Sequence, residues 1–254
     1  SSWRLGWRRR TRSPAVEPAH WPPMAGGEAG ALGPAAAKAG AVAACLCGKA
    51  GLSFAAFEPR MHLECACYDC FQALEWAASK GGPPAPIMPQ LYYFSNDIAE
   101  VRGEEHMRLY KLRADGRAVR VVTACCHSTL VVDHPCYAGN CLMSYADGCQ
   151  LTAGSMPAGG RIFLKDWVES RGEPPPFLGK DGTVVPVPEK VDFSFMKAEL
   201  AGPRRGISLQ ELCETRGCLE FVGVQTPGSS LPAAVKCAKL IGFSGLMSAS
   251  AVYK

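Results

Sequence analysis

The feature that most constrains this chain is the spacing of its cysteines. Seven of the 13 cysteines in 254 residues stand in CxC, CxxC or adjacent arrangements: Cys45, Cys47, Cys65, Cys67, Cys70, Cys125 and Cys126. Cysteines two positions apart rarely reach the short Cβ separation and the dihedral angle of a relaxed disulfide. A chain of this length can also bury a core without covalent staples. The spacing therefore favours metal coordination over disulfides and predicts an intracellular, reducing compartment.

Cys65, Cys67 and Cys70 place three thiols within six residues. One loop leading into a helix can direct such a set at a single soft cation such as Zn²⁺. Three thiolates leave a tetrahedral zinc ion one ligand short, and catalytic zinc sites keep that position for water or substrate. Two alternatives stay open: three reduced cysteines of the core, or a closed structural site completed by a residue elsewhere in the chain.

A second candidate site begins at the CxCG motif of Cys45 and Cys47, where Gly48 permits the backbone to turn around an ion. The adjacent pair Cys125 and Cys126 lies near the end of a predicted strand and could close this site. Neighbouring side chains on an extended strand point to opposite faces. We therefore expect at most one of the pair to be a ligand.

The remaining cysteines and histidines show no tight ligand spacing. His62 lies three residues before Cys65 and could stand beside the metal ligands. No dinucleotide-binding GxGxxG, P-loop or nucleophile elbow occurs. We expect ordinary buried thiols at the other six cysteines, which are Cys136, Cys141, Cys149, Cys213, Cys218 and Cys237.

The composition changes near residue 42. Residues 1–41 are rich in Arg, Pro, Gly and Ala and hold few large apolar residues, which predicts a flexible extension. Its Arg-rich, acid-poor start resembles an organelle presequence; alternatively, Met24 is the true start and the preceding residues are an upstream artefact. The sequence leaves open whether the protein resides in the cytoplasm or in an organelle.

Short apolar stretches separated by Gly, Pro and Asp follow from residue 42, at 91–94, 119–123 and 130–132 among others. This pattern is typical of strands. Helix formers predict a short helix over 70–79, and Asp181 with Gly182 predicts a hairpin turn at 180–182. Two further helices are expected at 209–219, opened by Ser208, and at 233–241.

The formal net charge of +4 is unevenly placed, because the first twelve residues hold five arginines and no acidic residue. The rest of the chain is near neutral and shows no basic run interleaved with aromatic residues, so we expect no nucleic-acid partner. No stretch approaches the roughly 20 apolar residues of a membrane-spanning helix. The sequence predicts a soluble protein.

The order of the cysteine motifs resembles the glutathione-dependent formaldehyde-activating enzyme and centromere protein V family. The shared pattern is CxCG at Cys45, CxCxxC at Cys65, and then a cysteine followed by a small-residue turn and Leu, here Cys126 to Leu130. Segments 101–104 and 160–167 resemble two further segments of that family. The resemblance covers residues 42–190 and leaves 191–254 as a C-terminal extension.

The resemblance implies a mainly β fold: a zinc-supported β-tent of antiparallel sheets with a short helix after the cysteine cluster. It also implies that Cys65, Cys67 and Cys70 are catalytic-type zinc ligands, and that Cys45 and Cys47 hold a structural zinc ion.

The chain departs from the family pattern at two places. The family's last motif is CxxCG, and aligning Cys126 on its second cysteine puts Thr123 on the first and His127 on the glycine. The structural site is then one ligand short, to be filled by Cys125 or His127 or left empty. Ala66 stands where the family often has His.

Our leading functional hypothesis, which the resemblance implies, is a zinc-dependent carbon-sulfur lyase-type enzyme acting on adducts of a small thiol and an aldehyde. Glutathione and formaldehyde are the family's substrate class, with glutathione as cosubstrate. The alternative is a non-catalytic, zinc-stabilised subunit that docks to a larger assembly through the two extensions. A third hypothesis is a redox or zinc-buffering role for exposed thiolates.

Overall fold

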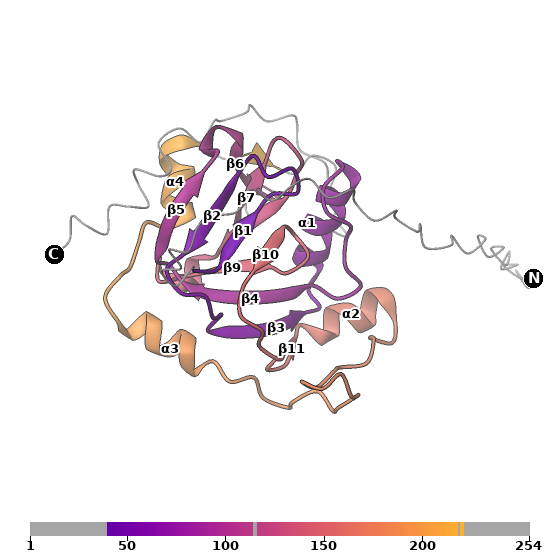
Figure 1. Ribbon diagram of the computed structural model, residues 1–254. Helices are drawn as coiled ribbons and strands as arrows, with labels where there is room; N and C mark the ends of the chain where they lie inside the picture. Colours follow the sequence, from indigo (N-terminus) through magenta and orange to yellow (C-terminus); the bar gives the residue numbers. More distant parts are fainter. Residues whose placement is uncertain (1–39, 114–115, 218, 221–254) are drawn as a thin grey trace, which may run out of the picture. The chain divides into compact units, whose positions relative to one another are not determined.

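The computed structural model describes residues 40–113, 116–217 and 219–220. Residues 1–39 of the predicted N-terminal extension, the predicted helix at 233–241, Cys218 and Cys237 lie outside the described residues. Ala41, which was assigned to that extension, is buried and bonded to the backbone of Phe54 and Ala56. Within them the fold is mainly β, as expected, and consists of two sheets with a few short helices (Figure 1). No helix in this part of the chain combines the length and the apolar character needed to cross a membrane.

The smaller sheet has four strands, all antiparallel. In spatial order they are β10 (Gln150–Thr152), β1 (Val42–Ala44), β2 (Gly51–Phe54) and β5 (Ile98–Arg102). β1 and β2 are adjacent in sequence, so the turn that joins them, at residues 45–50, carries the CxCG motif.

The larger sheet has eight strands, and its inner pairs are antiparallel. Both outermost pairs, β11 with β3 and β12 with β6, are parallel, so this sheet is mixed rather than purely antiparallel. In spatial order its strands are β11 (Arg161–Ile162), β3 (Met61–Cys65), β4 (Gln90–Ser95), β9 (Cys141–Tyr145), β8 (Thr129–Asp133), β7 (Val119–Thr123), β6 (Met107–Lys111) and β12 (Leu219–Glu220).

Alternation along the strands gives the larger sheet two apolar faces. One face packs against the smaller sheet, where the rings of Phe54 and Phe94 stack with centroids 4.2 Å apart. Val119 and Val121 belong to the same core. The opposite face carries Leu91 and other buried side chains, which form a separate cluster with Cys65, at the end of β3, and with Cys67 and Cys70, which follow it.

Helix α1 (Tyr68–Ser79) lies against this second face, since its Ala73 packs with Val122 of β7. It begins two residues before the predicted start, because Cys67 is its N-cap and accepts a hydrogen bond from the backbone N–H of Cys70. Its C-terminal end is followed by Gly81, whose φ of +90° is a conformation that glycine adopts without strain.

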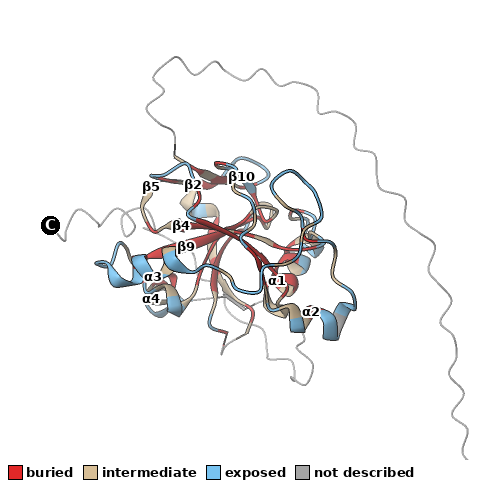
Figure 2. Cartoon of the chain, turned by 90° about the horizontal axis from the view of Figure 1, so that it is seen from below, coloured by how far each residue is buried: buried red, intermediate tan, exposed pale blue. Residues whose placement is uncertain are grey.

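The later segments carry the remaining helices and the predicted hairpin. Gly182 lies at the turn of the hairpin (φ +78°), and Leu178 pairs with Val184 across it. In Figure 2 the strands are largely buried, while the outer faces of α2 and α3 are exposed. The remaining helices are α2 (Leu164–Arg171), α3 (Ser194–Ala201) and α4 (Leu209–Arg216). Two short 3₁₀ turns lie earlier in the chain: η1 (Glu104–His106) and η2 (Pro135–Tyr137).

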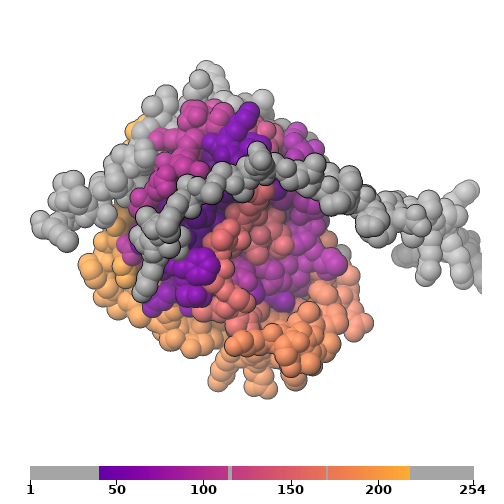
Figure 3. All heavy atoms as spheres, in the orientation of Figure 1, coloured from indigo at the N-terminus to yellow at the C-terminus, as the bar shows by residue number. Residues whose placement is uncertain are grey.

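The segment 191–217 packs against the β structure. In Figure 3 the orange segments that include α3 lie along the lower surface of the face shown. Glu199 of α3 is buried and pairs with Arg205 at 2.5 Å. Helix α4 begins at a capping box formed by Ser208 and Glu211, and its Leu209 and Leu212 are part of the core between the sheets. The start of this helix agrees with the prediction, and its end, at Arg216, lies three residues earlier.

Candidate metal centres

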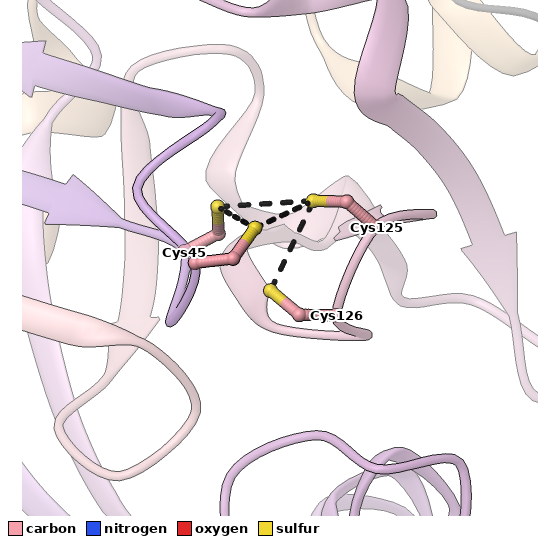
Figure 4. Close-up of side chains that lie close together, drawn as sticks. Cys45, Cys125 and Cys126 are labelled. Atoms are coloured by element: carbon pink, nitrogen blue, oxygen red, sulfur yellow. Dashed lines mark hydrogen bonds between the residues drawn. The ribbon is translucent and has the colours of Figure 1, made fainter.

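Four cysteines meet where the β1–β2 turn approaches the β7–β8 turn; we call Cys45, Cys47, Cys125 and Cys126 the outer cluster (Figure 4). Their sulfurs all lie within 4.8 Å of one another. The separations are 3.3 Å for Cys47–Cys125, 3.5 Å for Cys45–Cys47, and 3.9 Å for Cys45–Cys125 and Cys125–Cys126. Zn–S bonds of about 2.3 Å in a tetrahedron set the sulfurs about 3.8 Å apart. The donor set and its spacing therefore fit a closed four-thiolate zinc site.

The β1–β2 turn is shaped to present its sulfurs. Gly48 has a φ of +73° and donates its N–H to the Cys45 carbonyl at 2.9 Å, which closes the turn. The backbone N–H of Ala50 donates to the Cys45 sulfur at 3.2 Å. The N–H of Leu46 donates to the Ser128 hydroxyl at 3.0 Å, which ties this turn to the β7–β8 turn. The hydrogen bond from the Ala50 N–H to the Cys45 sulfur supports a thiolate ligand.

Both members of the adjacent pair lie in the outer cluster, although strand alternation led us to expect at most one of them to be a ligand. The argument from strand alternation does not apply, because β7 ends at Thr123 and the pair lies in the turn after it. His127, which follows, adopts φ +50° and reverses the chain direction. Cys125 thereby brings a fourth sulfur to the outer cluster.

The outer cluster contains one acidic thiol. Burial raises the pKa of Cys125 to about 12 and also raises the pKa of Cys45. Burial acts in the same direction on Cys126, but hydrogen bonds from Ser128 and Thr123 outweigh it and lower the pKa of Cys126 to about 6. At neutral pH the metal-free cluster therefore holds a thiolate at Cys126.

The second group, which we call the inner cluster, consists of Cys65, Cys67 and Cys70. Cys65 ends β3, Cys67 caps α1 and Cys70 lies in the first turn of that helix, so the three sulfurs converge within 4.8 Å. The Cys65 thiol donates to the Cys67 sulfur at 3.3 Å. Three soft donors at these separations fit a zinc ion with one position left for another ligand.

Burial is uneven within the inner cluster. Cys65 is 1% exposed and Cys70 is 7% exposed, whereas Cys67 is only half-buried. The accessible side of this site is therefore the side of Cys67. Among the described residues no fourth Cys, His, Asp or Glu joins the three sulfurs at ligand distance.

The three thiols share their protons unequally. Hydrogen bonds from Cys65 and Cys67 hold the pKa of Cys70 well below its usual range. Hydrogen bonds with Cys67 and Cys70, together with burial, raise the pKa of Cys65 well above its usual range. A hydrogen bond from Cys65 lowers the pKa of Cys67, but the proximity of Cys70 and burial outweigh it and raise this pKa to about 12. Of the three thiols, Cys70 is therefore the one whose thiolate form is favoured.

Two buried polar side chains lie on the same face of the sheet as the inner cluster: Arg120 of β7 and Tyr145 of β9. Neither residue was predicted from the sequence to lie near the cysteines. The sequence did carry a signal for Arg120, because it is a charged residue inside an apolar strand.

His62 does not lie beside the cysteines of the inner cluster. It alternates with Cys65 onto the other face of β3, where its ring stacks on Tyr92 with centroids 4.2 Å apart. Its ring nitrogens contact the Met156 carbonyl at 2.7 Å and Gln90 at 2.8 Å. These contacts fix His62 as a structural residue.

The remaining described cysteines are dispersed, and none joins either cluster. Cys141 and Cys149 are buried, as expected. Cys136 is exposed and Cys213 is half-buried, which corrects the prediction that all were buried thiols. Cys136 follows Pro135 in the short turn η2 at the surface, so no sheet or helix covers it.

No protein-family model matches this chain, and no curated protein sequence matches it. What the chain shows by itself is a mainly β fold with two cysteine clusters that could hold metal ions such as zinc.

Proposed function

We propose that the protein is a zinc-dependent carbon-sulfur lyase-type enzyme whose reaction takes place at the inner cluster. The observation that carries the proposal is the incomplete ligand set: three converging thiols, two of them buried, with the half-buried Cys67 on the accessible side. A closed structural site would use four protein ligands, the number of thiols that the outer cluster offers. The resemblance of the motif order to the formaldehyde-activating family supplies the reaction class.

Cys65, Cys67 and Cys70 would hold the catalytic zinc ion, and Cys45, Cys47, Cys125 and Cys126 the structural one. Zinc supplies a positive charge that lowers the pKa of a bound thiol or water by several units. The chain itself contributes the grouping of the sulfurs and the buried surroundings of Cys65 and Cys70, which exclude water from that side.

The proposed substrates are a small thiol, with glutathione as the family example, and an aldehyde such as formaldehyde. In the forward direction a bond forms between the thiol sulfur and the aldehyde carbon, the carbonyl π bond breaks, and the thiol proton ends on the new hydroxyl group. The reverse direction breaks the same carbon-sulfur bond. Neither direction needs an oxidant or a reductant.

The metal part of the proposal is tested by elemental analysis of purified protein. We expect two zinc ions per chain, one in the Cys67→Ser variant and one in the Cys47→Ser variant, because each substitution removes one ligand of one cluster. Cys136→Ser is the matched control, since Cys136 is exposed and belongs to neither cluster. Unchanged zinc in Cys67→Ser would remove Cys67 as a ligand.

The catalytic part is tested with ¹³C-formaldehyde and glutathione, by following formation of the hydroxymethyl adduct above its uncatalysed rate. We expect zinc-loaded wild-type protein and Cys136→Ser to accelerate exchange between free aldehyde and adduct, and Cys67→Ser to lose that acceleration. Zinc-loaded wild-type protein without acceleration would contradict the enzyme assignment.

That negative result would favour the alternative, a non-catalytic subunit stabilised by zinc. One observation supports this alternative: Val191, and Phe195 and Met196 of α3, pack against the apolar cluster that contains the inner cysteines. The segment after residue 190 therefore covers part of this face. Recovery of the chain as a stoichiometric subunit of a larger complex would support the alternative further.

A further inference from the structure

The outer cluster brings together sulfurs that lie far apart in the sequence. Across the junction of the β1–β2 and β7–β8 turns, the Cys125 sulfur contacts the Cys47 sulfur at 3.3 Å and the Cys45 sulfur at 3.9 Å (Figure 4). A relaxed disulfide has an S–S bond of about 2.05 Å, so the sulfurs of Cys47 and Cys125 would bond after approaching each other by about 1.3 Å.

The other close pairs of the outer cluster are less suited to a bridge. Cys45 and Cys47 are two positions apart in a tight turn, where a relaxed disulfide geometry is rarely reached. The Cα atoms of the adjacent Cys125 and Cys126 are about 3.8 Å apart, below the range of about 4.4–6.8 Å that disulfides span. A bridge from Cys45 to Cys125 would form at a side chain that is 0% exposed, whereas Cys47 is exposed. The geometry therefore favours Cys47 with Cys125.

Hydrogen bonds that do not involve sulfur hold the two turns together. The backbone N–H of Leu46 donates to the Ser128 hydroxyl at 3.0 Å, and the side-chain amide of Gln150 donates to the Leu46 carbonyl at 3.4 Å. The β1–β2 turn also has room to move, since a Cβ atom placed on Gly48 would meet no atom within 4 Å. The two sulfurs can therefore close on each other while the turns stay in contact.

We propose that Cys47 and Cys125 are a redox-modification site, at which a peroxide forms a reversible disulfide that replaces a metal ion as the link between the two turns. The redox role that exposed thiolates suggested from the sequence is thereby assigned to one pair of cysteines. The site is separate from the inner cluster, and the proposal does not depend on the lyase reaction.

The reaction consumes one peroxide molecule. A cysteine sulfur attacks one peroxide oxygen, the O–O bond breaks, and a sulfenic acid and one water molecule form. A second cysteine sulfur attacks the sulfenic sulfur, the S–O bond breaks, and the hydroxyl group leaves as water with the thiol proton. The two sulfurs together lose two electrons, which the peroxide gains.

The final position of the bridge does not depend on which sulfur reacts first. All four sulfurs of the outer cluster lie within 4.8 Å of one another. Thiol–disulfide exchange within the cluster can therefore move the bridge to the least strained pair. A reducing dithiol reverses the modification by the same exchange.

The bridge would remove two of the four thiols that the outer cluster offers to a metal ion. Cys45 and Cys126 alone do not complete the tetrahedral set of a structural zinc site, so the bridged cluster should not retain zinc. The disulfide would join residues 78 positions apart and take over the cross-link between the turns. We therefore expect the fold to persist after oxidation.

The competing pair is Cys67 and Cys70 of the inner cluster, because CxxC spacing at a helix N-terminus also suits a disulfide. Both side chains are more enclosed than Cys47, since Cys67 is half-buried and Cys70 is 7% exposed. Oxidation by a dissolved peroxide follows the exposure of the thiol. The outer pair should therefore react first.

The first test treats full-length, zinc-loaded protein with a small molar excess of hydrogen peroxide. The Cys136→Ser variant is the background, since the exposed Cys136 could link two chains. Free thiols are alkylated, linked peptides are mapped by mass spectrometry, and released zinc is followed with a chromogenic chelator. We expect one zinc ion and two free thiols to be lost per chain, with Cys47 linked to Cys125, and both to recover after dithiothreitol and Zn²⁺ are added.

Neighbouring substitutions separate the bridge partners from the other thiols. Cys125→Ser and Cys126→Ser each remove one thiol of the outer cluster, so their metal sites are equally incomplete. In metal-free protein, Cys126→Ser should form the Cys47–Cys125 bridge within about threefold of the wild-type rate, while Cys125→Ser should bridge Cys47 at least about tenfold more slowly. If either variant fails to fold, as circular dichroism would show, the peptides mapped from the background protein decide.

Several outcomes would overturn the inference. Earlier bridging of Cys67 with Cys70, or oxidation of Cys47 to a sulfinic acid without a bridge, would remove the assigned pair. Equal rates in Cys125→Ser and Cys126→Ser would show that the choice of partner does not matter. A Cys47–Cys125 bridge formed without loss of zinc would overturn the exchange of ion for disulfide. Failure of the formaldehyde assay would leave the inference intact, because it concerns the inner cluster.

Discussion

The two cysteine clusters use the same donor atom in opposite surroundings. The outer cluster has four sulfurs, an exposed Cys47, and two turns from different sheets. The inner cluster has three sulfurs from one strand-helix connection and lies beneath the surface. A complete ligand set at a junction suits a structural ion, whereas an incomplete set in a buried site leaves room for a reacting molecule.

The largest expected difference is in stability. Cys45→Ser should lose the outer metal ion and several kcal/mol of unfolding free energy, because structural zinc binding contributes directly to folding. Cys67→Ser should lose the inner ion with a smaller fall in melting temperature, since α1 remains packed through Ala73 and its neighbours. Thermal unfolding with parallel zinc analysis measures both effects. Equal losses in the two variants would break the distinction between a structural and a catalytic-type site.

The next effect concerns the rate of metal release. We expect a chelator in excess to remove the outer ion faster than the inner one, on the order of tenfold, because an exposed turn opens more readily than a covered core. Zinc release is followed with a colorimetric chelator, and Cys67→Ser and Cys47→Ser assign the two phases. Slower release from the outer cluster would reverse the comparison.

A third difference is pH-dependent reactivity in the metal-free protein. Cys126 is half-buried with a pKa of about 6, so its alkylation by iodoacetamide should rise with pH around a midpoint near 6. Because this pKa is below the ordinary thiol value of 9.0, the Cys126 thiolate contributes stability that is present above about pH 9 and is lost as the pH falls through 6.

The pKa of Cys70 is also lowered, but this side chain is buried, so it should react only when the fold opens. Peptide mass spectrometry across pH 5–8 distinguishes the two cysteines. Labelling of Cys70 before Cys126 would contradict the assignment of which cluster is open to solvent.

The smallest expected effect comes from His127→Gly. His127 adopts a left-handed φ of +50°, which glycine tolerates better, and the substitution should stabilise the turn by no more than about 1 kcal/mol. It also removes the ring that lies 5.6 Å from Trp76 of α1. Chemical denaturation measures the net change, and zinc content should stay at the wild-type value. Loss of the outer ion would show that His127 takes part in that site.

Local sequence patterns predicted the local parts of this structure well. The CxCxxC spacing predicted the convergence of Cys65, Cys67 and Cys70, because a short connection into a helix brings nearby sulfurs together. Ser208 predicted the start of α4, where its hydroxyl accepts the Glu211 N–H. Both results depend on contacts between residues a few positions apart.

The errors occurred where distant segments meet. Strand alternation excluded one of Cys125 and Cys126, but the chain leaves β7 before reaching them. The burial of Arg120 was also missed, because its contact with the Asp69 carbonyl at the start of α1 joins segments about 50 positions apart. The packing of Leu209 into the core was another feature that local periodicity did not indicate.

By itself, the sequence determined the mainly β character, the α1 helix and the membership of the inner cluster, since these follow from backbone preferences and short-range spacing. Only the tertiary structure decided that Cys45 and Cys47 meet Cys125 and Cys126, about 80 positions away along the chain. The physical reason is that packing of the two sheets around a shared core, rather than any local preference, brings the β1–β2 and β7–β8 turns to one point.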